Sequence, residues 1–164
     1  MNNTPNNITE VNDFSEFSKR DNNNKVLNIA TFNTCGINTS IKQWNLIDTL
    51  DKRNIHILGL SETKLSAKQA PFAFTKLDNS NFKFFHSSTD DNPKGQGVGI
   101  LIHSFYARYI HSIVRYKGRI IYLDLFMKGH SKLRIIQAYV PVHHDTPTNR
   151  SFRADIENKV LSYV

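Results

Sequence analysis

Two apolar segments of the sequence end on oxygen-bearing side chains that could hold a metal ion. The apolar run in LNIATFNTCGIN, residues 27 to 38, gives way to polar residues at Asn33. The apolar run in ILGLSETKLS, residues 57 to 66, ends before Glu62. A carboxylate oxygen and an amide oxygen are hard ligands of the kind that Mg²⁺ prefers. The pair therefore suggests one divalent cation between two strand ends. On residue type alone, a strand-end turn and a surface acid are the more common explanation.

A strand, a helix and a second strand are expected to bring these two side chains together. Val26 to Phe32 and Ile55 to Leu60 are apolar runs of strand length, and the segment between them has helical character. A strand–helix–strand unit forms a right-handed parallel crossover, so both strands end at the same edge of the sheet. Ligands of open α/β sheets gather at that edge. Asn33 and Glu62 are therefore predicted to be neighbours.

The intervening helix is predicted from its capping and periodicity. Ser40 with Gln43 three positions later resembles a capping box, and Arg53 lies near the expected C-terminus. The apolar residues at helical spacing, which predict the face packed on the sheet, are Ile41, Trp44, Ile47 and Leu50. Trp44 is accordingly expected in the core and not on a stacking platform.

The second half of the chain is expected to form an antiparallel meander and a helix. Five short strands are predicted, at residues 82–87, 97–103, 109–116, 119–127 and 133–140. Asp124 interrupts an apolar strand and is expected to pair with Arg134 across the next one. A last helix is predicted to begin near Thr146–Pro147. The fold class is α/β with a mixed sheet.

Composition indicates one basic globular domain behind a flexible leader. The chain has 164 residues, of which 39% are hydrophobic, and a formal net charge of +7, which favours polyanionic partners such as nucleic acid. Its single cysteine, Cys35, allows no internal disulfide and fits a reducing compartment, the nucleus or the cytoplasm. Residues 1 to 24 are Asn-rich and predict a flexible leader with one helical turn around 11 to 18, followed by the folded domain at residues 25 to 164.

Most other polar side chains have a plain structural interpretation. The histidines show no paired metal-ligand spacing, so zinc is disfavoured and structural roles are expected for His56, His86, His103, His111 and His130. Several cations could line a phosphate path, although loop-end positions also suit solvated charges: Lys64, Lys68, Lys94, Arg115, Lys117, Arg119, Lys128 and Lys132. Lys64 is the favoured phosphate contact because it follows Glu62 closely.

Four motifs in order resemble the endonuclease/exonuclease/phosphatase superfamily. They are IATFNTCGIN, ILGLSETKLS, GQGVGILIH and LRIIQAYVPV. The deoxyribonuclease I-like and AP-endonuclease branches, including endonuclease domains of LINE-type retrotransposons, are the most similar. The resemblance implies a metal-dependent phosphodiesterase on a four-layer α/β sandwich, with Mg²⁺ or Mn²⁺ as cofactor.

The resemblance also implies roles for individual residues. Asn33 and Glu62 correspond to the metal site, although Ser61 stands where the family often has Gln. Tyr139 corresponds to the catalytic tyrosine that contacts the scissile phosphate. Arg150, which resembles the opening of the family's next helix, is a second candidate for phosphate binding beside Lys64.

The resemblance covers only the N-terminal portion of the family's pattern, about residues 26 to 164. The family's later Gly-Asp-x-Asn and Ser-Asp-His motifs, which supply the groups that activate water, do not occur in the sequence. His143, His144 and Asp145 follow Tyr139 too closely to be either motif, and a polar loop is the better explanation. The C-terminal half of the sandwich is thus expected to be missing.

These observations predict the N-terminal part of an endonuclease that hydrolyses phosphodiester bonds, impaired or inactive as this chain. DNA is the favoured partner and no membrane is expected, but phosphoinositides and sphingomyelin remain alternative substrates. Two other classes stay open. One is a non-catalytic basic module that binds nucleic acid, and the other is a degenerate fragment.

Overall fold

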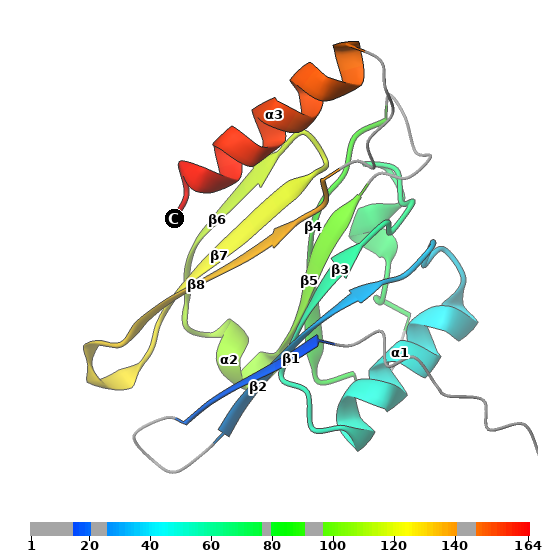
Figure 1. The fold of residues 1–164 in the computed structure, drawn as a ribbon. Helices are drawn as coiled ribbons and strands as arrows, with labels where there is room; N and C mark the ends of the chain where they lie inside the picture. The colour runs from blue at the N-terminus through cyan, green and yellow to red at the C-terminus, as the bar shows by residue number, and fades with distance from the viewer. Residues whose placement is uncertain (1–14, 21–25, 77–79, 91–96, 141–146) are drawn as a thin grey trace, which may run out of the picture.

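The computed structural model describes residues 15–20, 26–76, 80–90, 97–140 and 147–164, which build two β-sheets (Figure 1). Sheet A has the strand order β1-β2-β3-β5-β4, and sheet B has the order β6-β7-β8. The strands are β1 (Ser15–Arg20), β2 (Val26–Asn33), β3 (Ile57–Ser61), β4 (Phe82–Ser87), β5 (Val98–His103), β6 (Ile110–Tyr116), β7 (Ile120–Phe126) and β8 (Lys132–Ala138). The helices are α1 (Ser40–Lys52), α2 (Ser104–Ala107) and α3 (Pro147–Leu161), with single 3₁₀ turns at Ala70–Phe72 and Lys128–His130.

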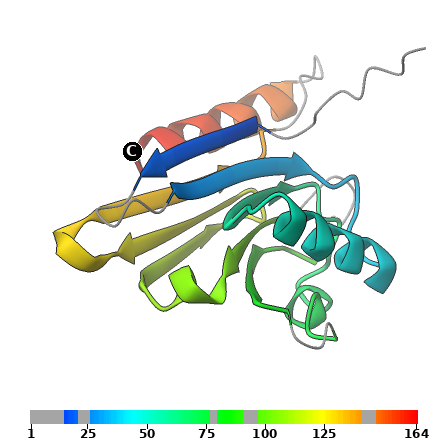
Figure 2. The ribbon, with the colours of Figure 1, turned by 90° about the horizontal axis from the view of Figure 1, so that it is seen from below.

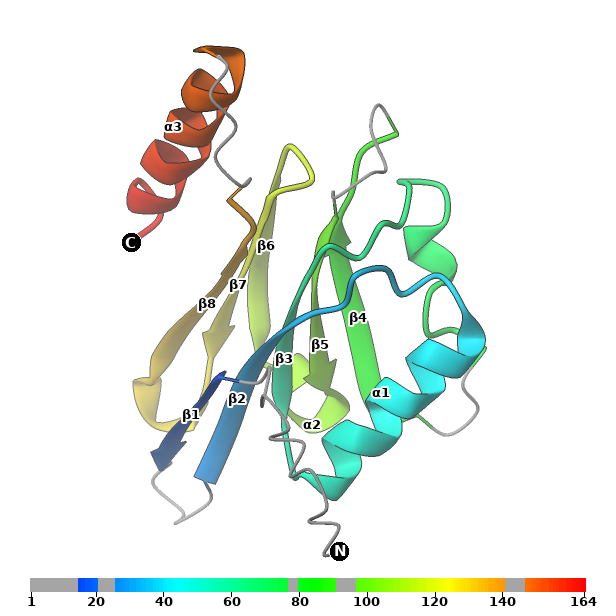
Figure 3. The same ribbon diagram turned by 45° about the vertical axis from the view of Figure 1, so that its right-hand side comes forward.

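The elements stack in four layers. Figure 3 shows α1 outside sheet A, the two sheets face to face, and α3 outside sheet B. One apolar cluster fills the space between α1 and sheet A, and a second fills the space between the sheets. Strand β3 serves both, because Ile57 points into the cluster between the sheets while Leu58 and Leu60 point toward α1. A strand buried on both faces reads as a continuous apolar run, as ILGL does.

The β2–α1–β3 unit is the parallel crossover that the sequence predicts. Strands β2 and β3 pair in parallel, and the last aligned pair is Asn33 with Ser61. Glu62 therefore leaves sheet A beside Asn33, at the edge where both strands end. Strands β4 and β5 continue the sheet in antiparallel pairing, which makes it mixed.

Helix α1 buries Ile47 and Leu50 as periodicity predicts, but the first half of the predicted apolar face is exposed. Ile41 is 74% exposed and Trp44 is 58% exposed, whereas Gln43 is buried. The Gln43 amide donates to the Ile37 carbonyl at 2.9 Å and accepts from the Phe74 amide at 2.8 Å. Buried backbone groups need such partners, and an apolar side chain at this position could supply neither bond. The prediction of Trp44 as a core residue is wrong.

The cap of α1 also differs from the prediction. Thr39, not Ser40, is the N-cap, and its hydroxyl accepts from the backbone of Lys42 at 3.4 Å. Gln43 does not reach back to the cap, because its amide bonds the chain beyond the helix. The capping box is therefore replaced by a single cap that starts one residue earlier.

Strand β1 lies within the segment that the sequence predicts to be a leader. Ser15–Arg20 pairs antiparallel with β2, where one helical turn was expected at residues 11 to 18 (Figure 2). This pairing uses the backbone groups of the edge of β2, so it needs no apolar pattern in the added strand. The rest of the leader lies outside the described residues, and the domain boundary at residue 25 stays a prediction.

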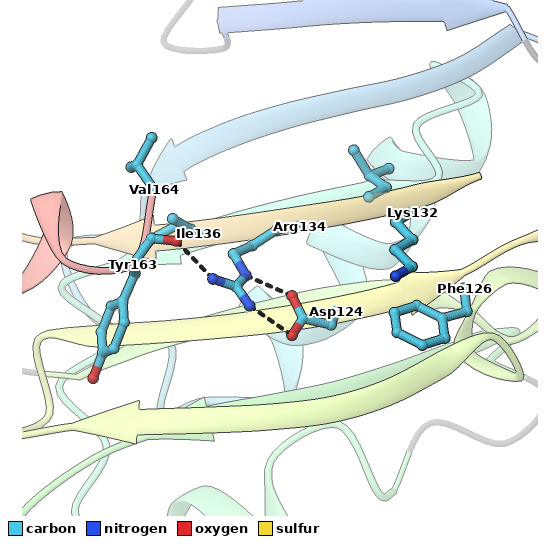
Figure 4. Close-up of a pocket in the computed structure, with 8 residues that line it drawn as sticks. Asp124, Phe126, Lys132, Arg134, Ile136, Tyr163 and Val164 are labelled. Carbon is cyan, nitrogen blue, oxygen red and sulfur yellow. Dashed lines mark hydrogen bonds and ion pairs between the residues drawn. The ribbon is translucent and has the colours of Figure 1, made fainter. Parts of the chain in front are cut away.

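Sheet B is an antiparallel meander whose outer face carries an ion pair. Asp124 on β7 lies directly opposite Arg134 on β8. The Arg134 guanidinium donates to both Asp124 carboxylate oxygens, at 2.6 and 2.9 Å, which confirms the predicted cross-strand pair. Arg134 also donates to the Tyr163 carbonyl at 2.7 Å (Figure 4), so the ion pair ties the end of α3 to the sheet.

Helix α3, which begins at Pro147 as the sequence predicts, packs on the outer face of sheet B. Ile156 is fully buried, and Phe152 and Val160 are partly buried. The Tyr116 hydroxyl donates to Asp155 at 3.0 Å, which fixes the helix against β6. Within the described ranges, no helix has both the length and the apolar character needed to cross a bilayer.

Candidate metal and phosphate site

The chain beyond β2 and β3 keeps its pairing after the strands end. The Thr34 amide donates to the Ser61 carbonyl at 3.0 Å, and the Gly36 amide donates to the Glu62 carbonyl at 2.8 Å. The Thr34 hydroxyl adds a bond to the Glu62 carbonyl at 3.0 Å. These bonds hold the two connecting segments side by side, so the edge of sheet A is a defined frame for side chains.

Three non-glycine residues at this edge adopt left-handed backbone conformations. Their φ angles are 46° at Cys35, 51° at Glu62 and 54° at Lys64. Such conformations cost free energy for residues with a Cβ atom, and they persist where surrounding contacts enforce them, often at functional sites. At Glu62 the turn ends the buried strand. It is the local reason that a carboxylate leaves the core here.

Glu62, Asn33 and Tyr139 form one hydrogen-bonded group, which we call the Glu62 cluster. The Tyr139 hydroxyl donates to Glu62 Oε1 at 2.8 Å, and Asn33 Nδ2 donates to the same oxygen at 3.1 Å. Asn33 Oδ1 accepts from the Cys35 amide at 3.0 Å, which sets the orientation of the side chain. Since Tyr139 directly follows β8, the cluster joins side chains from both sheets.

Arg119 lies behind the Glu62 cluster and is buried. Only 7% of its surface is exposed. Its guanidinium carbon lies 5.1 Å from the centre of the Tyr139 ring and 5.8 Å from that of Phe152. The sequence predicts Arg119 to be one of several charges at loop ends. A position directly after the Lys117–Gly118 turn does not predict burial. Arg119 is buried because α3, which contributes Phe152, covers this end of sheet B.

The cluster keeps Glu62 ionised. The hydrogen bond from Tyr139 is the main cause that lowers the pKa of Glu62, and Asn33 and the positive charges of Lys64 and Arg119 lower it further, against the opposing effect of burial. Burial, with the bond to Glu62, raises the pKa of Tyr139, so its hydroxyl remains a donor. The site therefore presents a carboxylate at neutral pH.

The two candidate phosphate contacts have different positions. Lys64 is exposed beside Gly36, and its charge acts on Glu62. Arg150 is exposed in the first turn of α3, two residues before Phe152. The structure thus brings Lys64 to the Glu62 cluster, and the role of Arg150 stays a prediction. His143, His144 and Asp145 lie outside the described residues.

The donor set of the cluster suits a hard cation with several water ligands. Glu62 Oε2 makes no hydrogen bond in the described part of the chain, whereas Asn33 Oδ1 accepts from the Cys35 amide at 3.0 Å and from Cys35 Sγ at 3.6 Å. One carboxylate and one amide oxygen fit Mg²⁺, which usually keeps waters. No group of three or more His, Cys, Asp or Glu side chains that could hold a metal occurs among these described residues.

Comparisons with known proteins give a clear result for structure and none for sequence. No family model and no curated protein matches the sequence. Among solved structures, AP endonuclease LMAP from Leishmania major matches with a TM-score of 0.63 at 16% identity, over 81% of this chain and 46% of that one. The Xenopus laevis APE2 catalytic domain matches with a TM-score of 0.59 at 14% identity, over 79% and 50%. An AP endonuclease from Archaeoglobus fulgidus matches with a TM-score of 0.58 at 19% identity, over 84% and 50%.

The chain shares its fold with part of each of these three AP endonucleases. It corresponds to part of the deoxyribonuclease I-like sandwich, as the four motifs predict. The chain spans about half the length of the solved structures that it matches. At these identities the likeness establishes the architecture, and the chemistry has to be argued from the side chains of the Glu62 cluster.

Proposed function

We propose that the chain is the N-terminal part of a metal-dependent endonuclease that hydrolyses phosphodiester bonds in DNA. The observation that carries the proposal is the Glu62 carboxylate, bonded by Tyr139 and Asn33 at the edge where β2 and β3 end. Its support is the fold shared with AP endonucleases and the net charge of +7, which suits a polyanion.

Each residue of the site has a role in the proposal. Glu62 and Asn33 would hold Mg²⁺, which when bound supplies positive charge to phosphate oxygens. Tyr139 holds Glu62 in place and, beside the same carboxylate, contacts the scissile phosphate. Lys64 and Arg150 bind neighbouring phosphates as charges without reading sequence. The buried charge of Arg119 lies behind Tyr139 and keeps the site electropositive.

The proposal includes weak activity for this chain. No residue of the Glu62 cluster is placed to act as a general base, and the sequence lacks the two motifs that would provide one. Loss of that role alone lowers the rate by roughly 10²–10⁴-fold. We therefore propose that the chain binds the cation and the phosphate backbone but cleaves slowly.

Metal binding can be tested separately from cleavage. Mn²⁺ titration followed by electron paramagnetic resonance would compare the wild-type protein with Glu62→Gln. We expect affinity to fall about tenfold or more, because an amide replaces the only carboxylate of the cluster. Glu157→Gln on the exposed face of α3 is the matched control and should leave Mn²⁺ affinity unchanged. Equal affinity in wild-type and Glu62→Gln proteins would reject the metal site.

A second candidate function is a non-catalytic module that binds nucleic acid. The net charge favours it independently of Glu62. Binding to a DNA duplex should then weaken steeply as salt rises, because neutralised phosphates release counterions. Under this alternative, Glu62→Gln leaves DNA affinity unchanged, and Mg²⁺-dependent nicking of plasmid is absent even at high protein concentration.

A further inference from the structure

A polar pocket lies at the edge of sheet A opposite the Glu62 cluster. Its volume is about 360 Å³, at the lower end of the roughly 300–1,000 Å³ typical of small-molecule sites. It is lined by Leu50, Asp51, Asn54, Ile55, His56, Phe82, His103, Phe105 and Tyr106. His56 precedes β3 and Glu62 follows it, so the pocket is roughly 20 Å from the Glu62 cluster at about 3.3 Å per residue.

Two histidines stand side by side in this pocket. The His103 amide donates to the His56 carbonyl at 2.8 Å, and the pairing of Ile57 with Ile102 continues this register. Directly opposed residues of an antiparallel pair project from the same face of the sheet. Both side chains therefore lie on the face that α1 covers, at the C-terminal end of that helix.

Backbone hydrogen bonds fix the tautomer of both imidazoles. His56 Nδ1 accepts from the Asn28 amide at 3.1 Å, and His103 Nδ1 accepts from the Phe105 amide at 3.2 Å. A neutral imidazole that accepts at Nδ1 carries its proton at Nε2. Neither Nε2 makes a hydrogen bond within the described ranges, so the pair offers two N–H donors to the pocket.

This arrangement disfavours both a metal ion and an anion. A metal-ligating histidine usually donates its second ring nitrogen to a partner, whereas both rings here accept at that position. The pocket lining contains Asp51 and no Lys or Arg, and the C-terminal end of α1 adds partial negative charge. Burial, with the nearby His103, lowers the pKa of His56, which keeps its ring uncharged at neutral pH.

Aromatic rings complete the walls of the pocket. The rings of Phe82 and His103 are 5.4 Å apart at 89°, and those of His56 and Tyr106 are 5.3 Å apart at 67°. Phe105, which is 39% exposed, also lines the pocket, and the Arg108 guanidinium lies over its ring at 3.9 Å. Flat apolar walls with a few oriented polar groups are suited to an aromatic ligand that is itself flat.

We propose that this pocket binds one uncharged planar nitrogen heterocycle of the nucleobase type. The His56 and His103 Nε2–H groups donate to ring or carbonyl acceptors of the base, and the Asp51 carboxylate accepts from its amino group. Such a base has two sources, a free nucleoside or an unpaired nucleotide of a single strand. The inference does not depend on the proposed nuclease function, because none of these residues belongs to the Glu62 cluster.

Asparagine substitutions test the Nε2 donor of each histidine, because they remove it and keep an acceptor in place of Nδ1. In His103→Asn the new Oδ1 can still accept from the Phe105 amide and cap α2, while the Nε2 donor is lost. His56→Asn does the same toward the Asn28 amide. His130→Asn, at an exposed position of the hairpin between β7 and β8, is the matched control.

Calorimetric titration with adenosine, guanosine and a short single-stranded oligonucleotide would measure binding, beside NMR of the histidine ring signals of the full chain. We expect each asparagine variant of the pocket to bind about fivefold to tenfold more weakly, as loss of one hydrogen bond predicts, and His130→Asn to bind as the wild type does. Binding of adenosine or guanosine identifies a free nucleoside as the source of the base. Binding by the oligonucleotide alone, sensitive to His103→Asn, points to a strand.

Two results would overturn the inference. One is the absence of binding by all three probes, and the other is binding that both pocket variants leave unchanged. Should the variants fail to fold, ring signals of wild-type His56 and His103 that do not shift on saturation with any probe would overturn it as well. Inorganic phosphate serves as the anion probe, and its binding at these two histidines would contradict the charge argument.

Discussion

The hydrogen bond from Tyr139 to Glu62 is the contact in the candidate site whose effect can be worked out most fully. Tyr139→Phe removes the hydroxyl and keeps the ring that packs between the sheets. A hydrogen bond to a charged group contributes about 1.5–3 kcal/mol where water is excluded. Glu62 is partly exposed, so water replaces much of the lost bond and the expected destabilisation is about 1 kcal/mol.

The sign of the pH dependence follows from the direction of the shift. The cluster lowers the pKa of Glu62, first through Tyr139, so the folded protein favours the carboxylate more than the unfolded chain does. This contribution is present above the unfolded pKa of about 4.3 and is lost as pH falls through the lower folded pKa. The stability difference between wild type and Tyr139→Phe should therefore be largest near pH 7 and should shrink as pH falls below about 4.3.

Two measurements check this reasoning. Urea unfolding at several pH values gives the stability difference, and carbon-13 NMR of the Glu62 carboxyl group follows its titration directly. We expect the pKa of Glu62 to rise toward its ordinary value in Tyr139→Phe. Tyr122→Phe, on the outer face of sheet B, is the control and should leave it unchanged. An unaltered Glu62 titration in Tyr139→Phe, or a stability difference independent of pH, would refute the argument.

Two further predictions concern packing. A Cβ atom at Gly59 would lie 1.9 Å from Gln137 Oε1, so Gly59→Ala should destabilise the protein by about 1–3 kcal/mol in urea unfolding. In a double-mutant cycle with Gln137→Ala, that penalty should shrink by about 1 kcal/mol or more. Ile156→Ala should cost about 2–5 kcal/mol, because Ile156 is fully buried on the inner face of α3. Leu161→Ala, at a position 72% exposed on the same helix, should change stability by less than about 0.5 kcal/mol.

Each of these predictions has an outcome that contradicts it. Additive effects of Gly59→Ala and Gln137→Ala would show that the two side chains do not compete for the same space between the sheets. Equal and small effects of Ile156→Ala and Leu161→Ala would show that α3 does not pack on sheet B in solution.

The parallel pairing of β2 with β3 and the meeting of Asn33 with Glu62 could be predicted because they follow from local pattern and chain connectivity. An apolar run, a helix and a second apolar run usually form a right-handed parallel crossover. In that arrangement both strands end at the same edge of the sheet. The Asp124–Arg134 pair was predictable for the same reason, since the short hairpin fixes which residues face each other.

The features that sequence analysis missed depend on contacts between distant segments. Gln43 is buried because Phe74, 31 residues later, needs an acceptor for its amide. That bond turns Trp44 outward, against the apolar periodicity of α1. Arg119 is buried because β8 and α3 close over it, and β1 forms on the backbone of β2. None of these contacts leaves a signal in the spacing of residues along one element.

The Glu62 carboxylate receives one hydrogen bond from each sheet, from Asn33 of sheet A and from Tyr139 beyond β8 of sheet B. In the proposed metal site, the alignment of the two layers and the affinity for a cation are therefore thermodynamically linked. A ligand that binds more tightly to the aligned state stabilises the packing of the two layers. A substitution between the layers that favours a shifted arrangement lowers the affinity for that ligand by the same free energy. Substitutions between the sheets are thus expected to act on the Glu62 carboxylate through the Tyr139 hydrogen bond.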